Sequence, residues 1–140
     1  MATVNIYLTF DGNCEEAFNF YKSVFGGEFQ YIGRFKDMPP EDKSMSVPQD
    51  QAERIMHVSL PISKETILMG SDTAGEWAVT FKQGNNFSIS ITADSKEEAE
   101  RIFNGLAKGG VVSMPLTVTF WSAYLGTPGS RSEERRVGKE

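Results

Sequence analysis

The stretch Asp11-Gly-Asn-Cys-Glu-Glu-Ala17 returns later in the chain as Asp94-Ser-Lys-Glu-Glu-Ala99, a spacing of 82 or 83 residues. Each copy opens a segment with apolar residues at helical spacing, and each segment stops at a glycine pair, Gly26-Gly27 or Gly109-Gly110. A repeat at a fixed spacing is typical of a duplicated supersecondary unit. We therefore expect two copies of one strand-helix-strand unit, with a small-molecule cleft between the copies.

The first copy lies among segments that alternate apolar and polar residues as strands do. The expected strands are residues 4–10, 28–34, 54–61 and 65–70. Asn13 is the expected N-cap of the helix, with Glu16 completing a capping box. The polar stretch 36–53 is expected to be a long loop, either a lid over a pocket or disordered. Module one is therefore predicted to be a strand, a helix and three strands.

The second copy begins after Phe87–Thr92, whose strict alternation predicts the first strand of module two. A helix is expected over residues 95–108. Its candidate capping pairs are Ser95 with Glu98 and Asp94 with Glu97. Two further strands are expected at 111–114 and 117–125, interrupted by Pro115. The last strand that the repeat requires is expected to be missing.

Composition limits the class of protein. The chain has 140 residues with 19 acidic and 14 basic side chains, a net charge of -5. Such a length suits one domain, and the acidic balance argues against nucleic acid or an anionic membrane as a partner. The single cysteine cannot form an internal disulfide, and no leader or membrane-length apolar run is visible. We expect a cytoplasmic protein with a small-molecule partner.

The last ten residues, Arg131–Glu140, carry seven charges and one isolated valine. A segment of this composition cannot bury enough apolar surface to become ordered. It is also the residue-for-residue translation of AGATCGGAAGAGCGTCGTGTAGGGAAAGAG, which has the form of a sequencing adapter. The segment is therefore interpreted as an artefactual terminus, or else as a solvated charged tail. The expected single domain covers 1–130, with module one at 1–72 and module two at 86–126.

Four blocks follow one another in a recognisable order. They are Asn5–Glu28, Ile55–Leu60, Ile67–Asp72 and Thr119–Tyr124. In this order the chain resembles the PhnB-like branch of the vicinal oxygen chelate superfamily, relatives of glyoxalase and of bleomycin-resistance proteins. The resemblance implies an α+β fold of two tandem βαβββ modules, the glyoxalase/bleomycin resistance fold, which encloses a cavity and commonly forms a homodimer.

The resemblance also says where a metal would be held. Metal enzymes of the superfamily take ligands, typically His and Glu, from the first and last strands of the modules. The residues at those positions here are Asn5, Ile6, Tyr7, Thr66, Ile67, Leu68, Met69, Phe87, Ser88 and Ile89, with Glu65 where its strand starts. Catalytic divalent metals need imidazole and carboxylate donors that converge from separate strands. We therefore expect no bound catalytic metal and no other cofactor.

His57 is the only histidine, so acid-base chemistry near neutral pH would fall to it. It alternates with its apolar neighbours, which predicts a pocket residue, a structural hydrogen-bonded histidine or an exposed one. Trp121 and Tyr124 are either an aromatic wall for a flat ligand or core residues. The candidate pocket residues are Asn5, Tyr7, His57, Met69, Ser88, Trp121 and Tyr124. No residue is assigned as catalytic.

The leading hypothesis is a PhnB-like protein that binds a small organic molecule in its cleft without a catalytic metal. The contrasting hypothesis is a metal-dependent glyoxalase-like lyase or dioxygenase, with His57 as one ligand and another on the strand missing after Thr127. A third is a dimerising scaffold with a filled cavity. The sequence leaves open whether the protein is an enzyme and what its ligand is, because one fold hosts many chemistries.

Overall fold

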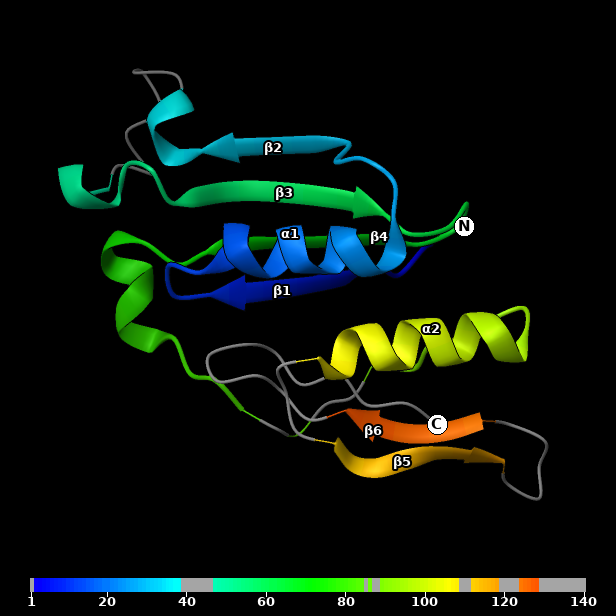
Figure 1. The fold of residues 1–140 in the computed structure, drawn as a ribbon. Coiled ribbons are helices and arrows are strands. Elements are labelled where there is room, and N and C mark those ends of the chain that lie inside the picture. The colour runs from blue at the N-terminus through cyan, green and yellow to red at the C-terminus, as the bar shows by residue number, and fades with distance from the viewer. Residues whose placement is uncertain are drawn as a thin grey trace. The chain divides into compact units, whose positions relative to one another are not determined.

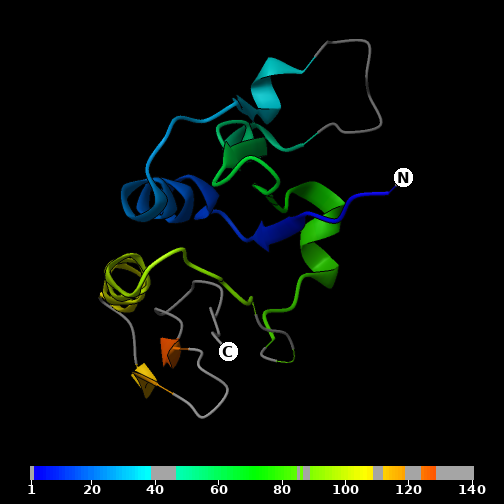
Figure 2. The same cartoon turned by 90° about the vertical axis from the view of Figure 1, so that its right-hand side faces the viewer.

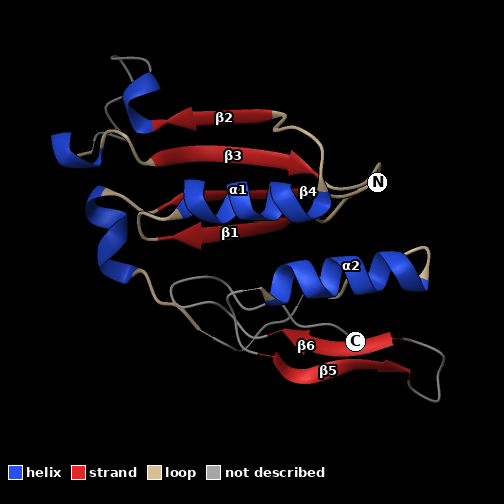
Figure 3. Cartoon of the chain, in the orientation of Figure 1, coloured by secondary structure: helices blue, strands red, loops and turns tan. Residues whose placement is uncertain are grey.

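The computed structural model describes residues 2–38, 47–84, 86, 89–108, 112–118 and 124–128. The chain divides into two compact units, Met1–Lys82 and Gln83–Glu140. Both units combine helix and strand, so the fold is mixed α+β as predicted (Figures 1 and 3). Among the described residues, no helix is both long and apolar enough to cross a membrane.

The first unit is a strand, a helix and three strands, which confirms the predicted order. Its elements are β1 (Ile6–Phe10), α1 (Cys14–Phe25), β2 (Tyr31–Arg34), β3 (Ile55–Pro61) and β4 (Ile67–Asp72). The strands form one sheet in the order β1-β4-β3-β2. The β1 strand runs parallel to β4, and the other two pairs are antiparallel. Helix α1 lies along one face of this sheet (Figures 1 and 2).

The core of the first unit forms where α1 meets the sheet. On β1 the alternate residues Leu8 and Phe10 are buried. The buried residues of α1 are Cys14, Ala17, Phe18, Tyr21 and Val24. Gly70 on β4 makes the close approach possible, because a Cβ there would lie 2.7 Å from Phe18 Cε1 and 2.8 Å from the Leu8 carbonyl oxygen. The side chains that alternate with these buried strand residues therefore point to the opposite face of the sheet, away from α1.

Strand ends differ from the sequence prediction. The β1, β2 and β4 strands start at Ile6, Tyr31 and Ile67, all later than expected, and β4 runs on to Asp72 instead of ending at residue 70. The extension of β4 follows from its pairing with β1, where Asp72 lies opposite Phe10. Alternation within one segment carries no information about a partner strand that is distant in sequence.

The start of α1 is capped differently from the prediction. Asn13 occupies the N-cap position but makes no side-chain capping hydrogen bond, so the predicted capping box with Glu16 is wrong. Asp72, at the end of β4, accepts hydrogen bonds from the backbone N–H groups of Gly12 and Cys14 instead. The predicted glycine stop is confirmed, since Gly26 has φ of 83° and donates to the Lys22 carbonyl at 2.8 Å.

Connections in the first unit contain short turns of 3-10 helix. They span Phe35–Asp37, Gln49–Gln51 and Gly75–Thr80. Residues 39–46 of the predicted loop lie outside the described residues, so the choice between a lid and disorder stays open. The turn before β4 is held by Ser63, whose hydroxyl accepts from the N–H groups of Glu65 and Thr66.

The second unit contains α2 (Lys96–Ala107), β5 (Val112–Val118) and β6 (Tyr124–Pro128). The two strands pair antiparallel, and α2 contacts both (Figure 3). Ser95 Oγ accepts from Glu98 N at 3.1 Å, and the Glu98 carboxylate accepts from Asp94 N at 2.8 Å. The Ser95–Glu98 cap is confirmed, and the Asp94–Glu97 alternative is wrong. Both helices have 12 residues and start 82 positions apart, at Cys14 and Lys96, as the repeat predicts.

Two strand predictions in the second unit are wrong. Residues 89–92 are irregular, although alternation over 87–92 predicts a strand; Phe87 and Ser88 lie outside the described residues. Pro115 does not interrupt β5, because shifts in the pairing register on both sides of Met114 accommodate it. Residues 129–140 lie outside the described residues, so the missing strand and the artefactual tail stay predictions.

Candidate functional site

The candidate site is the sheet face of the first unit that α1 does not cover. One residue from each strand lies in a single row of register partners there. The row consists of Tyr7 on β1, Met69 on β4, Ser59 on β3 and Tyr31 on β2. His57 lies two residues from Ser59 on β3 and therefore points to the same face. The sheet thus brings together residues 7, 31, 57 and 69, which are far apart in sequence.

Three aromatic rings meet on this face. The His57 ring centroid lies 5.6 Å from that of Tyr7, with planes 29° apart, and 5.9 Å from that of Tyr31, with planes 36° apart. Tyr7 Oη is 3.1 Å from His57 Nδ1, within hydrogen-bond distance. Tyr7 is 49% exposed and Tyr31 47% exposed. We call Tyr7, His57 and Tyr31 the aromatic row.

Gly33 determines how Tyr31 lies in the aromatic row. Gly33 is the register partner of His57, and a Cβ at this position would collide with Tyr31 Oη and lie 2.9 Å from Tyr31 Cζ. Because glycine has no side chain, the Tyr31 ring folds back over β2 toward the imidazole. Sequence reasoning missed both Tyr31 and Gly33, because their roles depend on the register between β2 and β3.

The other predicted pocket residues have different positions. Asn5 precedes β1, and its side-chain oxygen accepts from the Ile67 N–H at 3.0 Å, so it ties the beginnings of β1 and β4 together. Met69 is half-buried within the row between Tyr7 and Ser59. Ser88 and Trp121 lie outside the described residues, and Tyr124 is the first residue of β6.

The described residues do not suit a catalytic metal. No group of three or more His, Cys, Asp or Glu side chains in that part of the chain is placed to hold an ion. The first and last strands of module one present Tyr7 and Met69 to the open face, and His57 Nδ1 faces a tyrosine hydroxyl. A phenol, a thioether and one imidazole are not the donor set of a divalent catalytic site. Metal-free binding stays a prediction for the whole chain.

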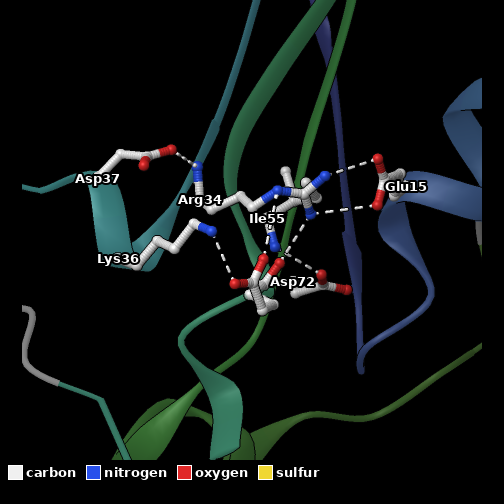
Figure 4. A network of polar contacts seen from close by, with 7 residues as sticks. Glu15, Arg34, Lys36, Asp37, Ile55 and Asp72 are labelled. Atoms are coloured by element: carbon white, nitrogen blue, oxygen red, sulfur yellow. Dashed lines mark hydrogen bonds and ion pairs between the residues drawn. The ribbon is translucent and has the colours of Figure 1, made fainter. Parts of the chain in front are cut away.

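A buried carboxylate holds one end of the sheet together. Asp72 is 4% exposed and accepts three backbone hydrogen bonds, from Gly12 at 2.8 Å, Cys14 at 3.0 Å and Ile55 at 2.8 Å. It thereby joins the end of β4 to the turn before α1. Through Ile55 it also joins β4 to the start of β3 (Figure 4). These hydrogen bonds fix the end of β4 against the turn that follows β1 and against the start of β3, the strand that carries His57.

Charged side chains connect β2 with α1 in the same region. Arg34 donates two hydrogen bonds to the Glu15 carboxylate, at 3.1 and 2.8 Å, and a third to the Glu53 carbonyl (Figure 4). The hydrogen bonds from Arg34 lower the pKa of Glu15, and the same contact raises the pKa of Arg34. Lys36 Nζ lies 2.7 Å from the Glu53 carboxylate. These groups are paired with one another and hold β2 in place.

Cys14 lies at the first position of α1 and is fully buried. Burial raises the pKa of its thiol, and the nearby carboxylates of Asp72 and Glu15 raise it further. A thiol of this kind stays protonated at neutral pH and is a poor nucleophile. Cys14 is therefore a core residue.

Comparison with known proteins agrees with this architecture. Residues 2–123 match the family model described as 3-demethylubiquinone-9 3-methyltransferase. The chain is 30% identical over 125 residues to protein YjdN of Escherichia coli K12. This alignment covers 86% of the chain and 82% of YjdN. It is 36% identical to protein PA1353 of Pseudomonas aeruginosa, whose crystal structure aligns over the whole of both chains with a TM-score of 0.79.

More distant structures share the fold. A putative 3-demethylubiquinone-9 3-methyltransferase, PhnB protein, from Bacillus cereus is 23% identical, with a TM-score of 0.70 over 99% of this chain and 100% of that one. A glyoxalase/bleomycin resistance protein/dioxygenase family enzyme from Burkholderia phytofirmans is 16% identical, with a TM-score of 0.53 over 98% and 95%. At these identities the likeness is one of fold, and it is the predicted glyoxalase/bleomycin resistance fold.

Proposed function

Because the chain belongs to the PhnB-like family of the vicinal oxygen chelate superfamily, described as 3-demethylubiquinone-9 3-methyltransferase, we propose that it binds a small organic molecule. The binding surface is the open face of the β1-β4-β3-β2 sheet, and no catalytic metal takes part. The methyl transfer named in the family description is not required for this role. The predicted cleft between the two modules stays a prediction.

One observation carries the proposal: the half-exposed rings of two tyrosines, from two different strands, meet the ring of the single histidine on a third strand. Aromatic side chains left open to solvent on a rigid sheet gain free energy when a ligand covers them. The hydrogen bond between Tyr7 and His57 holds two of these rings in a fixed relation. A face that is ordered before binding loses little conformational entropy when the ligand arrives.

The family resemblance also supports a homodimer, and the single cysteine suits a reducing compartment such as the cytoplasm. Sedimentation of the purified chain tests the dimer directly, since a dimer of a 15.6 kDa chain is twice as heavy as the monomer. A monomer at all concentrations would contradict this part of the proposal and leave the binding role unaffected.

A thermal-shift screen against small organic molecules tests the binding role. A molecule that binds only the folded protein raises its melting temperature by mass action. Each stabilising compound is then tested on His57→Ala and on Asn19→Ala, a control on the exposed side of α1. We expect stabilisation to be lost with His57→Ala and retained with Asn19→Ala. A screen without any stabilising compound contradicts the role, and equal stabilisation of both variants contradicts the location.

Metal analysis tests the alternative, a metal-dependent glyoxalase-like lyase or dioxygenase. We expect the purified chain, incubated with zinc, nickel, manganese or iron and then desalted, to retain no stoichiometric metal. Retention of one ion per chain that His57→Ala removes would favour the metal-dependent enzyme over our proposal.

A further inference from the structure

Building on the proposed function, we infer that the aromatic row takes a flat, uncharged aromatic molecule that bears a hydrogen-bond acceptor, and that the Nε2–H group of His57 donates to this acceptor. The shape, the charge and the hydrogen bonding of the aromatic row each favour a molecule of this kind.

The shape of the row favours a flat ligand. The rings of Tyr7 and Tyr31 lie on either side of the imidazole, at centroid distances of 5.6 and 5.9 Å, and both ring planes are within 36° of the imidazole plane. Tyr7 and Tyr31 are each about half exposed, so a planar ring that lies against either of them covers aromatic surface that is open to solvent. Offset stacking of aromatic rings contributes more than the burial of the same apolar area. A saturated ring of the same size is not flat and gains less.

The charge around the row favours an uncharged ligand. The register partners across the face are tyrosine, methionine and serine. Two charged side chains at the ends of the strands that carry Tyr31 and His57 have partners of opposite charge: Arg34, the last residue of β2, pairs with Glu15, and Arg54, just before β3, pairs with Asp11. A charged ligand would lose hydration on this face without gaining an ion pair, which is unfavourable.

The hydrogen bonding of His57 supplies the polar contact. Tyr7 is its hydrogen-bond partner within the described residues, at Nδ1. When the tyrosine hydroxyl donates to Nδ1, that nitrogen carries no proton, and the neutral imidazole carries its proton on Nε2. Nε2 is then a donor that no described side chain uses, and it suits a carbonyl or similar acceptor on the ligand.

Three matched probes separate these contributions. Acetophenone has both an aromatic ring and a carbonyl group, ethylbenzene has the ring alone, and cyclohexyl methyl ketone has the carbonyl alone. Because the chain has one histidine, its imidazole signals in nuclear magnetic resonance spectra report binding at this face without ambiguity. The full chain is titrated with each probe, and the nitrogen spectrum of the neutral ring shows which nitrogen carries the proton.

We expect acetophenone to move the His57 signals and to bind about three- to tenfold more tightly than ethylbenzene, the range that one net hydrogen bond supplies. It should also bind more tightly than cyclohexyl methyl ketone, which accepts the same hydrogen bond but has no aromatic ring to stack. Tyr7→Phe, which removes only the hydroxyl group and with it the hydrogen bond that selects the Nε2–H tautomer, is expected to reduce the preference of acetophenone over ethylbenzene. Gly33→Ala, which displaces the Tyr31 ring, is expected to weaken acetophenone and ethylbenzene alike. Unchanged folding of both variants is checked by circular dichroism.

Equal binding of the three probes, or a proton found on Nδ1 of the neutral ring, would overturn the inferred ligand class. The proposed function would survive that result, because a compound from the thermal-shift screen that moves the His57 signals still shows binding at the face. If neither the probes nor any screened compound moves the His57 signals, both the ligand class and the proposed site are wrong.

Discussion

Asp72 caps the start of α1, a role that the local sequence assigns to Asn13 and Glu16. Its carboxylate accepts hydrogen bonds from the N–H groups of Cys14 and Gly12, which lie 58 and 60 residues earlier in the chain. A capping pattern is read from neighbours three or four residues apart, so it gives no sign of a cap supplied by another strand. Tyr31 and Gly33 escaped prediction for the same reason, since their contact with His57 exists only in the folded sheet.

Asp72→Asn is expected to lower the free energy of unfolding by about 1–3 kcal/mol. Asparagine replaces one acceptor oxygen with an NH₂ group, which leaves a buried backbone N–H without an acceptor. Urea unfolding followed by circular dichroism measures the change. The matched control is Asp11→Asn, which weakens the exposed ion pair with Arg54 but keeps an amide oxygen that can accept from Thr73 Oγ1. It should lower the free energy of unfolding by less than about 1 kcal/mol. Equal losses in the two variants would contradict the role given to Asp72.

Cys14 is expected to react with thiol reagents far more slowly in the native protein than in the unfolded one. Its raised pKa keeps the buried thiol protonated, so native labelling must wait for local or global opening. Above about pH 8.5 the unfolded thiol ionises while the folded one does not. The unfolded state then binds fewer protons, and this group lowers stability as pH rises. Native labelling as fast as labelling in urea would contradict this account.

The two helices show which parts of an element can be predicted from sequence. The cap of α2 was predicted correctly because Ser95, Glu98 and Asp94 are neighbours that bond one another. The apolar stripes of both helices were also visible in the sequence, since helical spacing is a local property. The prediction of a strand at 87–92 is wrong over its described residues. Alternation shows that a segment would have one apolar and one polar face as a strand, but it does not supply a strand to pair with.

Ser95→Ala is expected to lower the free energy of unfolding by about 1 kcal/mol, because it removes the acceptor for the Glu98 N–H. Ser95→Asn is the matched control, since asparagine is an equally good N-cap residue, and it should leave stability nearly unchanged. Urea unfolding of the full chain gives both values. If alanine and asparagine have the same effect, the side-chain cap does not contribute.

Glu15→Gln is expected to weaken the contact between α1 and β2. It should lower the free energy of unfolding by less than about 1 kcal/mol at pH 7, because the ion pair with Arg34 is partly exposed and screened. The pKa of Glu15 is lowered in the folded state. Its contribution is therefore present above the ordinary glutamate pKa of about 4.3 and is lost as pH falls through the folded value.

Unfolding free energies of the wild type and of Glu15→Gln, measured at pH 7 and at pH 3, should converge at the lower pH. Glu100→Gln is the control, since its 4.0 Å contact with Lys96 lies on the exposed face of α2. A difference between the wild type and Glu15→Gln that is independent of pH would rule out the ion pair as its cause.

At the scale of the whole molecule, the repeat was the strongest signal in the sequence. It predicted two helices at matching positions, and these positions are 14–25 and 96–107. The family resemblance then gave the fold, which solved structures share. The candidate site was predicted only in part: Tyr7 and His57 were among the candidates, whereas the pairing of their side chains required the order and register of four strands.

The most direct test of the proposed binding face is a crystal structure of the full chain with the tightest compound from the thermal-shift screen. The account predicts that the compound lies over the sheet of the first unit, in contact with the rings of Tyr7 and His57. A compound bound elsewhere on the protein, with the aromatic row still open to solvent, would contradict it.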